Sequence, residues 1–423
     1  MISCLRDPAR HVVILSNLHL CHNPRVLKEA TALAAAGYEV TVLGAWHDAE
    51  LKRRDQALLE RSAFRFRPVV DMTEPGIGVQ FFRAAAKAAS LAARYGGRES
   101  RWQLGYVYPA LRRAAWRSRG DLYVAHLEPA LAVALDLARA GRRVAVDIED
   151  WYSEDLLPEA RRYRPLRLLR RLEGQLLRQA RYATCPSAAM SRALGAAYGC
   201  RPPDVIYNAF PWSDRQRLDG VAKDRRQRHV PSICWFSQTL GRGRGLEDLL
   251  AALSWVRHPA EIHLRGRPIA ELDGWLAART PAEWRNRVFI HGLVANDELL
   301  SRIAEHDIGF AGEMRYCPNK ELTVSNKMLQ YLLAGLAVMA SDTEGQREVA
   351  AQAEDAVLLY PSGNPRALAA QLDALLAEPT RLNRAKAAAL QAARTTFCWE
   401  RQEPVLLDRV SAALEGRLPS DRS

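Results

Sequence analysis

Short apolar runs alternate with amphipathic segments along most of the chain. Residues 11–16 form an apolar run of the kind found in strands that are buried on both faces. Asn23 and Pro24 then provide a helix cap and a first helical residue, and Gly37 provides a stop. A second apolar run follows at 39–44, so the chain is expected to open with a strand–helix–strand unit.

The same alternation fills two long blocks of sequence. The first block predicts helices at 129–140 and 187–198 and strands at 121–126, 142–147, 183–186 and 204–208. The second block predicts helices that begin near 245 and at 325, and strands at 233–237, 261–265, 287–291, 307–311, 336–341 and 356–360. Repeated alternation of this kind predicts an α/β fold with two Rossmann-like, doubly wound parallel sheets. Ligands of such sheets bind beyond the carboxyl ends of the strands.

A polar stretch separates the two blocks. Residues 214–229 are charged and lack apolar periodicity, which indicates a linker. With 423 residues, the chain is also too long for one ordinary core. We therefore expect an N-terminal domain at 1–210, a linker at 211–230 and a C-terminal domain at 231–397, facing each other across a cleft. A last helix at about 398–416 is expected to pack back on the N-terminal domain.

Composition narrows the class of protein. No apolar stretch reaches the roughly 20 residues that a bilayer crossing requires, and residues 1–10 lack an apolar signal core. The seven cysteines are scattered, which favours reduced thiols and a cytoplasmic location. A net charge of +12 suggests anionic partners, although the many arginines and alanines could also reflect genomic base composition.

Two segments of the C-terminal block are suited to binding phosphate. Ser325 can cap a helix whose first turn holds Asn326 and Lys327, and a helix N-terminus with a lysine attracts a diphosphate. A loop at 238–245 joins a strand to a helix and carries Gly241, Arg242 and Arg244, which allow close backbone approach and bidentate phosphate contacts. The alternative, that Lys327 is only a solvated first-turn residue, remains open.

The N-terminal block places polar residues at strand ends. His126 ends one predicted strand, and Asp147, Glu149 and Asp150 follow the end of another. Two of these carboxylates could line a cleft, raise each other's pKa and accept a proton. They could equally cap a helix near Ser153, and His126 could be structural. The loop at 17–23 is expected on the same edge, and its His19, Cys21 and His22 lack the further ligands of a metal site.

Two basic segments belong to the N-terminal block. Arg83–Arg119 mixes nine Lys and Arg with tryptophan and tyrosine, and Arg161–Arg181 mixes eight Arg with leucine. Basic amphipathic helices bind anionic membrane surfaces, and they would suit a lipid-diphosphate acceptor. Helices that pack on the sheet with solvated arginine faces are the alternative.

Several motifs in order resemble the bacterial family 4 glycosyltransferases. They include Asn23-Pro24-Arg25-Val26, Asp147-Ile-Glu149-Asp150, Pro186-Ser187 with Met190, Ile206-Tyr207-Asn208, the 237–245 loop, the 326–349 stretch and Trp399-Glu400. This resemblance covers about 11–412. It implies the GT-B fold, a nucleotide-sugar donor on the C-terminal domain, no obligatory metal and usually retention of the anomeric configuration. Many members carry two glutamates eight residues apart, where this chain has Leu322 and Gln330, with Glu321 one position off.

We therefore expect a glycosyltransferase that moves a sugar from a nucleoside-diphosphate sugar to a glycan or lipid-linked acceptor. We expect neither a cofactor nor a nucleic-acid partner, and we expect the enzyme in the cytoplasm, where the inner face of the plasma membrane is a candidate location. The expected roles are catalytic for His126, Glu149 and Asp150, acceptor-side for Asn17, Asn23 and Arg25, and donor-binding for Gly241, Arg242, Arg244, Glu321, Ser325, Asn326, Lys327, Gln330 and Glu348. The alternatives are a nucleotide-sugar 2-epimerase and a non-catalytic basic protein that binds membrane or nucleic acid.

Overall fold

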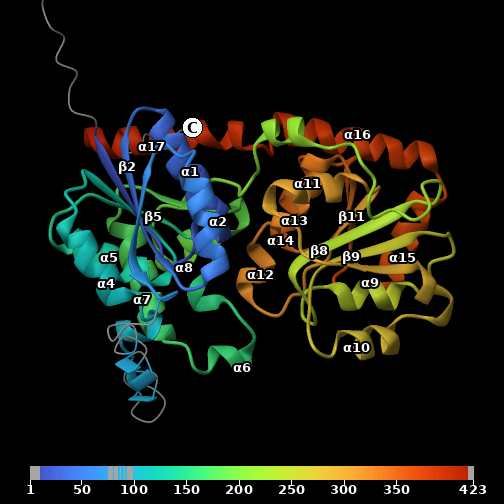
Figure 1. The fold of residues 1–423 in the computed structure, drawn as a ribbon, viewed down its shortest axis with the longest axis horizontal. Helices are drawn as coiled ribbons and strands as arrows, with labels where there is room; N and C mark the ends of the chain where they lie inside the picture. Colours follow the sequence, from blue (N-terminus) through green and yellow to red (C-terminus); the bar gives the residue numbers. More distant parts are fainter. Residues whose placement is uncertain are drawn as a thin grey trace, which may run out of the picture. The chain divides into compact units, whose positions relative to one another are not determined.

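The computed structural model describes residues 10–74, 80, 84–85, 87–89, 91–92 and 99–417, and these form two compact units (Figure 1). The first unit comprises Met1–Pro186, Met190–Ile206 and Glu403–Ser423. The second comprises Ser187–Ala189 and Tyr207–Gln402. Each unit is built around its own parallel sheet.

The sheet of the first unit is parallel throughout, in the order β3-β2-β1-β4-β5-β6-β7. Its strands are β1 (His11–Leu15), β2 (Glu39–Trp46), β3 (Arg65–Asp71), β4 (Leu122–His126), β5 (Val144–Asp147), β6 (Ala183–Cys185) and β7 (Asp204–Val205). The order reverses between β1 and β4, which is where ligands of such sheets bind.

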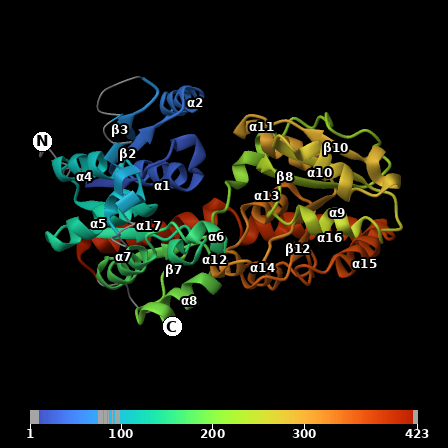
Figure 2. The ribbon, with the colours of Figure 1, turned by 90° about the horizontal axis from the view of Figure 1, so that it is seen from below.

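Helices cover this sheet, and α4, α5 and α7 lie next to one another (Figure 2). Helix α5 is the middle one of these three and packs against both α4 and α7. The helices are α1 (Pro24–Ala35), α2 (Ala49–Leu59), α4 (Tyr108–Arg117), α5 (Glu128–Arg139), α6 (Pro158–Arg161), α7 (Leu166–Gln179) and α8 (Ala188–Tyr198). Helix α1 begins as its sequence predicts, with Pro24 first and the Asn23 side chain accepting a hydrogen bond from Val26 N.

The sheet of the second unit repeats this topology, in the order β10-β9-β8-β11-β12-β13. Its strands are β8 (Ser232–Leu240), β9 (Glu261–Pro268), β10 (Val288–His291), β11 (Ile308–Ala311), β12 (Ala337–Ser341) and β13 (Val357–Tyr360). Here the order reverses between β8 and β11. Both sheets are therefore doubly wound, which confirms the predicted fold class.

Two apolar clusters bury the two faces of this second sheet. The helices that supply them are α9 (Leu246–Ala252), α10 (Leu272–Arg279), α11 (Asn296–Ala304), α13 (Asn326–Ala334), α14 (Glu344–Ala350), α15 (Pro365–Leu376) and α16 (Pro379–Thr395). Two more helices are α12 (Pro318–Leu322) and α17 (Trp399–Glu415). Residues of α17 from Glu403 onward count with the first unit, where Arg409 Nε lies 2.9 Å from an Asp204 oxygen.

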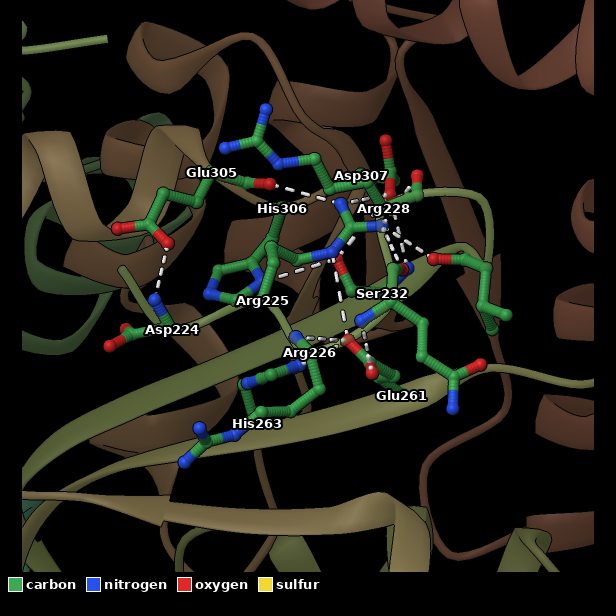
Figure 3. A network of polar contacts seen from close by, with 12 residues as sticks. Asp224, Arg225, Arg226, Arg228, Ser232, Glu261, His263, Glu305, His306 and Asp307 are labelled. Atoms are coloured by element: carbon green, nitrogen blue, oxygen red, sulfur yellow. Dashed lines mark hydrogen bonds and ion pairs between the residues drawn. The ribbon is translucent and has the colours of Figure 1, made fainter. Parts of the chain in front are cut away.

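The segment expected to be a linker lies within the second unit (Figure 3). We call Asp219–Val230 the strap. Arg225 anchors it, because its Nη1 donates to Asp307 at 2.9 Å and to the Glu305 carbonyl at 3.0 Å. Glu261 of β9 accepts the backbone N–H groups of Arg226 and Gln227. The sequence of the strap is charged and lacks apolar periodicity because polar and charged groups, and not apolar ones, attach it to the sheet.

Candidate functional site

The carboxyl ends of β8 and β11 bring together the two segments that the sequence predicts to bind phosphate. The loop after β8 holds Gly241 to Gly245, and Gly245 has the left-handed φ of +79°. A Cβ atom at Gly245 would lie 2.1 Å from the carbonyl oxygen of Gly312, which follows β11. Only glycine fits this contact, so the glycine loop packs directly on the segment that leads to Glu313.

Glu313 joins this loop to the N-terminus of α13. One of its oxygens lies 3.2 Å from Lys327 Nζ and accepts a 3.1 Å hydrogen bond from the Ser325 hydroxyl. Both Glu313 and Lys327 side chains are only 14% exposed. Although burial acts to raise it, the charges of Lys327 and Lys320 lower the pKa of Glu313 below its usual value. Sequence reasoning missed Glu313, because no local pattern marks it as the partner of Lys327.

Ser325 therefore acts differently from the expected cap. It precedes α13 in the capping position, but its side chain makes no capping hydrogen bond and turns to Glu313 instead. Lys327 is likewise more than a solvated residue. In addition to Glu313, its Nζ lies 5.8 Å from the ring centroid of Trp235, so the ammonium group is held in one place.

The two arginines of the glycine loop are exposed. Arg244 donates to the Ser237 hydroxyl at 3.0 Å, and Arg242 forms no ion pair with any residue that the structure describes. Gly241 is buried against Ile269, with 3.5 Å between that side chain and a Cβ placed on the glycine. The loop thus carries two exposed guanidinium groups and packs, through Gly245, on the segment that leads to Glu313. Guanidinium groups suit a diphosphate.

The other expected donor residues divide into two groups. Glu321 accepts from Glu344 N and pairs with Arg315, and Glu348 accepts from Ala188 N and Ala189 N, so both carboxylates support the backbone. Asn326 is exposed and accepts from Asn208. The Gln330 side-chain oxygen is buried without a hydrogen bond to any described residue. Gln330 can therefore still accept a hydrogen bond from a ligand hydroxyl.

In the first unit, a buried polar cluster lies at the carboxyl ends of β4 and β5. His126 is fully buried, with Nε2 2.7 Å from Glu29 and Nδ1 2.9 Å from Glu149. Because both partners are carboxylates, both ring nitrogens carry protons. Burial alone would lower the pKa of His126, but the charges of Glu29 and Asp147 and the two hydrogen bonds raise it to about 10. This geometry favours a positioning role, and the catalytic role of His126 stays a prediction.

Asp147 of this cluster does not have the raised pKa that the sequence suggested. Arg25 holds Asp147 through Nε and Nη2, and Thr184 donates to the same carboxylate at 2.9 Å. Burial opposes it, but Arg25 and His126 lower the pKa of Asp147. Asp147 is therefore an ionised partner of Arg25, which corrects that expectation. The roles of Glu149 and Asp150 stay predictions.

Arg25 and Asn23 are structural members of the same cluster. Arg25 Nη1 also donates to the Ile206 carbonyl at 2.7 Å, and Asn23 donates to Glu149 at 3.2 Å. Asn17 lies in the same loop, and its side-chain oxygen is buried without a hydrogen bond to any described residue. Three residues were expected to face an acceptor. Of these, only Asn17 has a side-chain polar atom that makes no hydrogen bond to a described residue.

One residue outside every motif shapes this loop. Asp55 of α2 is fully buried and accepts hydrogen bonds from His19 Nδ1, Leu20 N and Cys21 N at 3.0, 3.1 and 2.8 Å. The other nitrogen of His19 accepts from His47 N at 2.9 Å. With both nitrogens engaged, His19 has none available for a metal ion.

Ligand atoms of Glu29, His126 and Asp147 all lie within 4.8 Å of one another, a spacing that a metal ion could span. However, Arg25 contacts both oxygens of Asp147, and His126 uses both nitrogens for carboxylates. A cation would have to displace a guanidinium group and deprotonate an imidazolium. These residues therefore do not fit a metal ion.

Comparison with known proteins places this geometry in a family. Residues 22–210 match the family model of the glycosyl transferase 4-like domain, and residues 231–378 match that of glycosyl transferases group 1. No curated protein matches the chain.

Solved structures share the fold over nearly the whole chain. HepE of Anabaena in complex with UDP is 19% identical, with a TM-score of 0.64, and the match covers 95% of this chain and 100% of HepE. Sucrose-phosphate synthase of Thermosynechococcus elongatus is 14% identical, with a TM-score of 0.69 and coverage of 96% and 100%. A putative UDP-N-acetylglucosamine 2-epimerase of Listeria monocytogenes is 13% identical, with a TM-score of 0.58 and coverage of 99% and 100%. With its two family domains in this order and these two sheets, the chain belongs to the family 4 glycosyltransferases of the GT-B fold.

Proposed function

We propose that this glycosyltransferase takes its sugar from a nucleoside-diphosphate sugar bound by the second unit. The contact between Gly245 and Gly312 carries the proposal, because it packs the loop that holds Arg242 and Arg244 on the segment that leads to Glu313, the partner of Lys327. The nearby carboxylates are Glu313 and Glu247, of which Glu247 accepts from Gly243 N at 2.6 Å. Three cationic side chains against these two carboxylates leave a surplus of one positive charge for a diphosphate. Similar structures with UDP and with UDP-glucose, both of HepE, support a nucleotide sugar as the donor.

The chemistry follows from this charge. The bond between the anomeric carbon and the diphosphate oxygen breaks, and negative charge develops on that oxygen. Arg242, Arg244 and Lys327 stabilise this charge without reorganisation, a factor that usually dominates such catalysis. The acceptor hydroxyl oxygen forms the new bond to the anomeric carbon. Its proton passes to the leaving phosphate, so this step requires no strong base from the protein.

We further propose that transfer retains the anomeric configuration and proceeds without a metal ion. A proton that moves to the leaving phosphate is compatible with attack from the face that the phosphate leaves. The arginines and Lys327 supply the positive charge that a metal would otherwise supply. A glycan or a lipid-linked sugar is the proposed acceptor, and the cytoplasm, at the inner face of a membrane, is the proposed location.

Ligand binding to the full chain tests the donor site. Thermal unfolding is measured with UDP, ADP, GDP and the corresponding sugars, because a ligand at 100 times its Kd adds about 2.7 kcal/mol to stability. Arg244→Ala and Lys327→Ala should abolish the shift. Arg394→Ala should keep it, since this exposed arginine lies on α16, outside the site. Absence of a shift with every nucleotide, or an equal loss in all three variants, would refute the proposed donor site.

Product analysis separates transfer from epimerisation. The protein is incubated with the stabilising nucleotide sugar alone and then with glycan and lipid-linked acceptors. Transfer predicts a glycosylated product that forms only with an acceptor and keeps the donor configuration. A change of configuration at C2 of the donor sugar without any acceptor would identify a 2-epimerase. Activity that survives a chelator would support transfer without a metal ion.

A further inference from the structure

A second concave site lies on the first unit, between α4 and the 3-10 helix η2 (Arg101–Leu104). It is a hollow of about 680 Å³. Arginine and tryptophan side chains dominate its lining, namely Arg101, Trp102, Arg112, Arg113, Trp116 and Arg117. We call it the arginine–tryptophan pocket. No part of the proposed donor site contributes to it.

The pocket carries a surplus of positive charge. Its one carboxylate, Asp136, lies 2.6 Å from Arg101 Nη1 through each oxygen and accepts from Arg112 Nε at 3.1 Å. Asp136 is therefore saturated by two of the four arginines. Arg113 and Arg117 are exposed, and neither forms an ion pair with any residue in the described part of the chain. Four arginines against one carboxylate leave three net positive charges in the pocket.

Helix α4 holds these groups outward. Leu111, Ala114 and Ala115 are buried on the side of α4 that packs against the first sheet. Helical periodicity then places Arg112, Arg113, Trp116 and Arg117 on the opposite face. Trp116 is 41% exposed, and the Arg112 guanidinium group lies 5.8 Å from its ring centroid. An exposed tryptophan between free arginines matches an interface between water and lipid, where indole rings are favoured.

The second basic segment behaves differently. On and before α7, Arg161 and Arg170 both pair with Glu154, at 2.7 and 2.8 Å, and Arg164 pairs with Glu128. These pairs engage three of the eight arginines of Arg161–Arg181 with two carboxylates. Residues 83, 86, 90 and 93–98 of the first segment lie outside the described residues, and the portion of it that lines the pocket comes from η2 and α4.

We propose that the arginine–tryptophan pocket binds the headgroup phosphates of anionic phospholipids and so docks the first unit on a membrane surface. Guanidinium groups bind phosphate oxygens through paired hydrogen bonds, while Trp102 and Trp116 enter the headgroup layer. Within the described chain, no helix combines the length and the apolar content needed to cross a bilayer, so this attachment is peripheral. The proposal stands independently of the donor site.

Vesicle sedimentation with the full chain tests the proposal. Sucrose-loaded vesicles contain phosphatidylcholine alone or with 30 mol% phosphatidylglycerol, at about 0.1 M salt. We expect binding only to the anionic vesicles. A basic residue near such a surface contributes about fivefold in affinity, so Arg113→Ala with Arg117→Ala should weaken binding by about 25-fold. Trp116→Ala should weaken it further without a change in charge.

The matched control removes two exposed arginines elsewhere, Arg53 on α2 and Arg394 on α16, which have no ion-pair partner among the described residues. We expect this double variant to bind like the wild type. Equal loss in both double variants would show that net charge alone acts, and would overturn the pocket. So would equal binding to neutral vesicles, no binding to either kind, or tighter pocket-dependent binding to duplex DNA than to vesicles. Unchanged thermal unfolding of each variant excludes misfolding as the cause.

Discussion

Mild acid should destabilise the second unit through a buried histidine cluster beneath the strap. His263 of β9 is 1% exposed, with Nε2 3.1 Å from Glu261 and Nδ1 3.0 Å from His291 Nε2. The rings of His263 and His306 lie 4.6 Å apart, and His306 contacts the Ser232 hydroxyl (Figure 3). The charged groups that face these rings are Asp224, Arg225, Arg226, Glu261 and Arg265.

The sign of the effect follows from the pKa values. Burial is the main cause that lowers the pKa of His263, from 6.5 to about 4, and the neighbouring His291 lowers it further. The hydrogen bond and charge of Glu261 oppose this shift without reversing it. Burial likewise lowers the pKa of His291 and, more strongly, of His306. Above pH 6.5 these histidines are neutral in the folded and the unfolded chain alike. Between pH 6.5 and 4 only the unfolded chain gains protons, so the folded state loses stability as the pH falls.

The magnitude for His263 alone is about 1.4 kcal/mol at pH 5.5, since one pH unit below the unfolded pKa corresponds to that energy. His291 and His306 add to this loss. The assay is hydrogen exchange of the strap amides at pH 7.5 and 5.5, corrected for intrinsic exchange, because local opening reports the free energy of this unit. His258 is a suitable control position, because its side chain is 42% exposed and contacts Asp373, which does not belong to the cluster. His258→Asn should leave the pH dependence unchanged, and His306→Asn should reduce it.

One result would refute this reasoning directly. Glu261, His263, His291 and Asp224 form a chain with three contacts, the last of them 3.3 Å between His291 Nδ1 and Asp224. Two neutral rings supply only two protons for these three contacts. If the carboxylates outweigh burial, the ring pair binds a third proton, and the strap becomes more protected as the pH falls. Greater protection at pH 5.5, or none of the expected loss, would therefore reject burial as the dominant cause.

Three further outcomes test other contacts of the two units. Glu313→Gln should tighten nucleoside-diphosphate binding by about fivefold in calorimetry, because Lys327 loses its counter-ion; weaker binding would make Glu313 part of the nucleotide contact. Gly245→Ala should cost at least about 2 kcal/mol of stability, because it adds backbone strain and a 2.1 Å contact with Gly312. Gly243→Ala should cost only about 1 kcal/mol, because Gly243 has a φ of +75° but open space around it. Equal losses in the two variants would reject the Gly245–Gly312 contact. Between pH 6.5 and 10, His126 keeps its proton in the folded chain but loses it in the unfolded chain, so the first unit should lose stability as the pH rises over that range. His126→Gln should abolish this pH-dependent loss.

The buried strands and the capped helices could be predicted from the sequence because their signals are local. Strand β3 and helix α2 could not. Strand β3 is an edge strand that pairs only with β2, and its polar residues and Pro68 conceal it. Helix α2 buries Asp55 and no apolar residue completely, so it lacks the apolar stripe that periodicity detects.

The cationic residues of the proposed donor site could be found in the sequence for the same reason. Lys327 and Arg244 stand next to a helix start and a glycine loop, and both features can be recognised within ten residues of sequence. Their partners are not local. Glu313 reaches Lys327 across 14 positions, and Glu29 reaches His126 across 97. A topology that aligns the strand ends must be known before such pairs can be inferred.

Net charge alone is misleading for the same reason. The value of +12 suggested two basic surfaces, but three arginines of the second one, Arg161, Arg164 and Arg170, pair with Glu154 and Glu128. Those pairs are internal, so their charge is largely cancelled at the distance where a membrane or a phosphate would sense it. On α4, Arg113 and Arg117 have no such carboxylates within the described residues. The charge available to an outside partner is therefore set by the acids that the fold brings near each base, and in the arginine–tryptophan pocket four arginines meet a single carboxylate, Asp136.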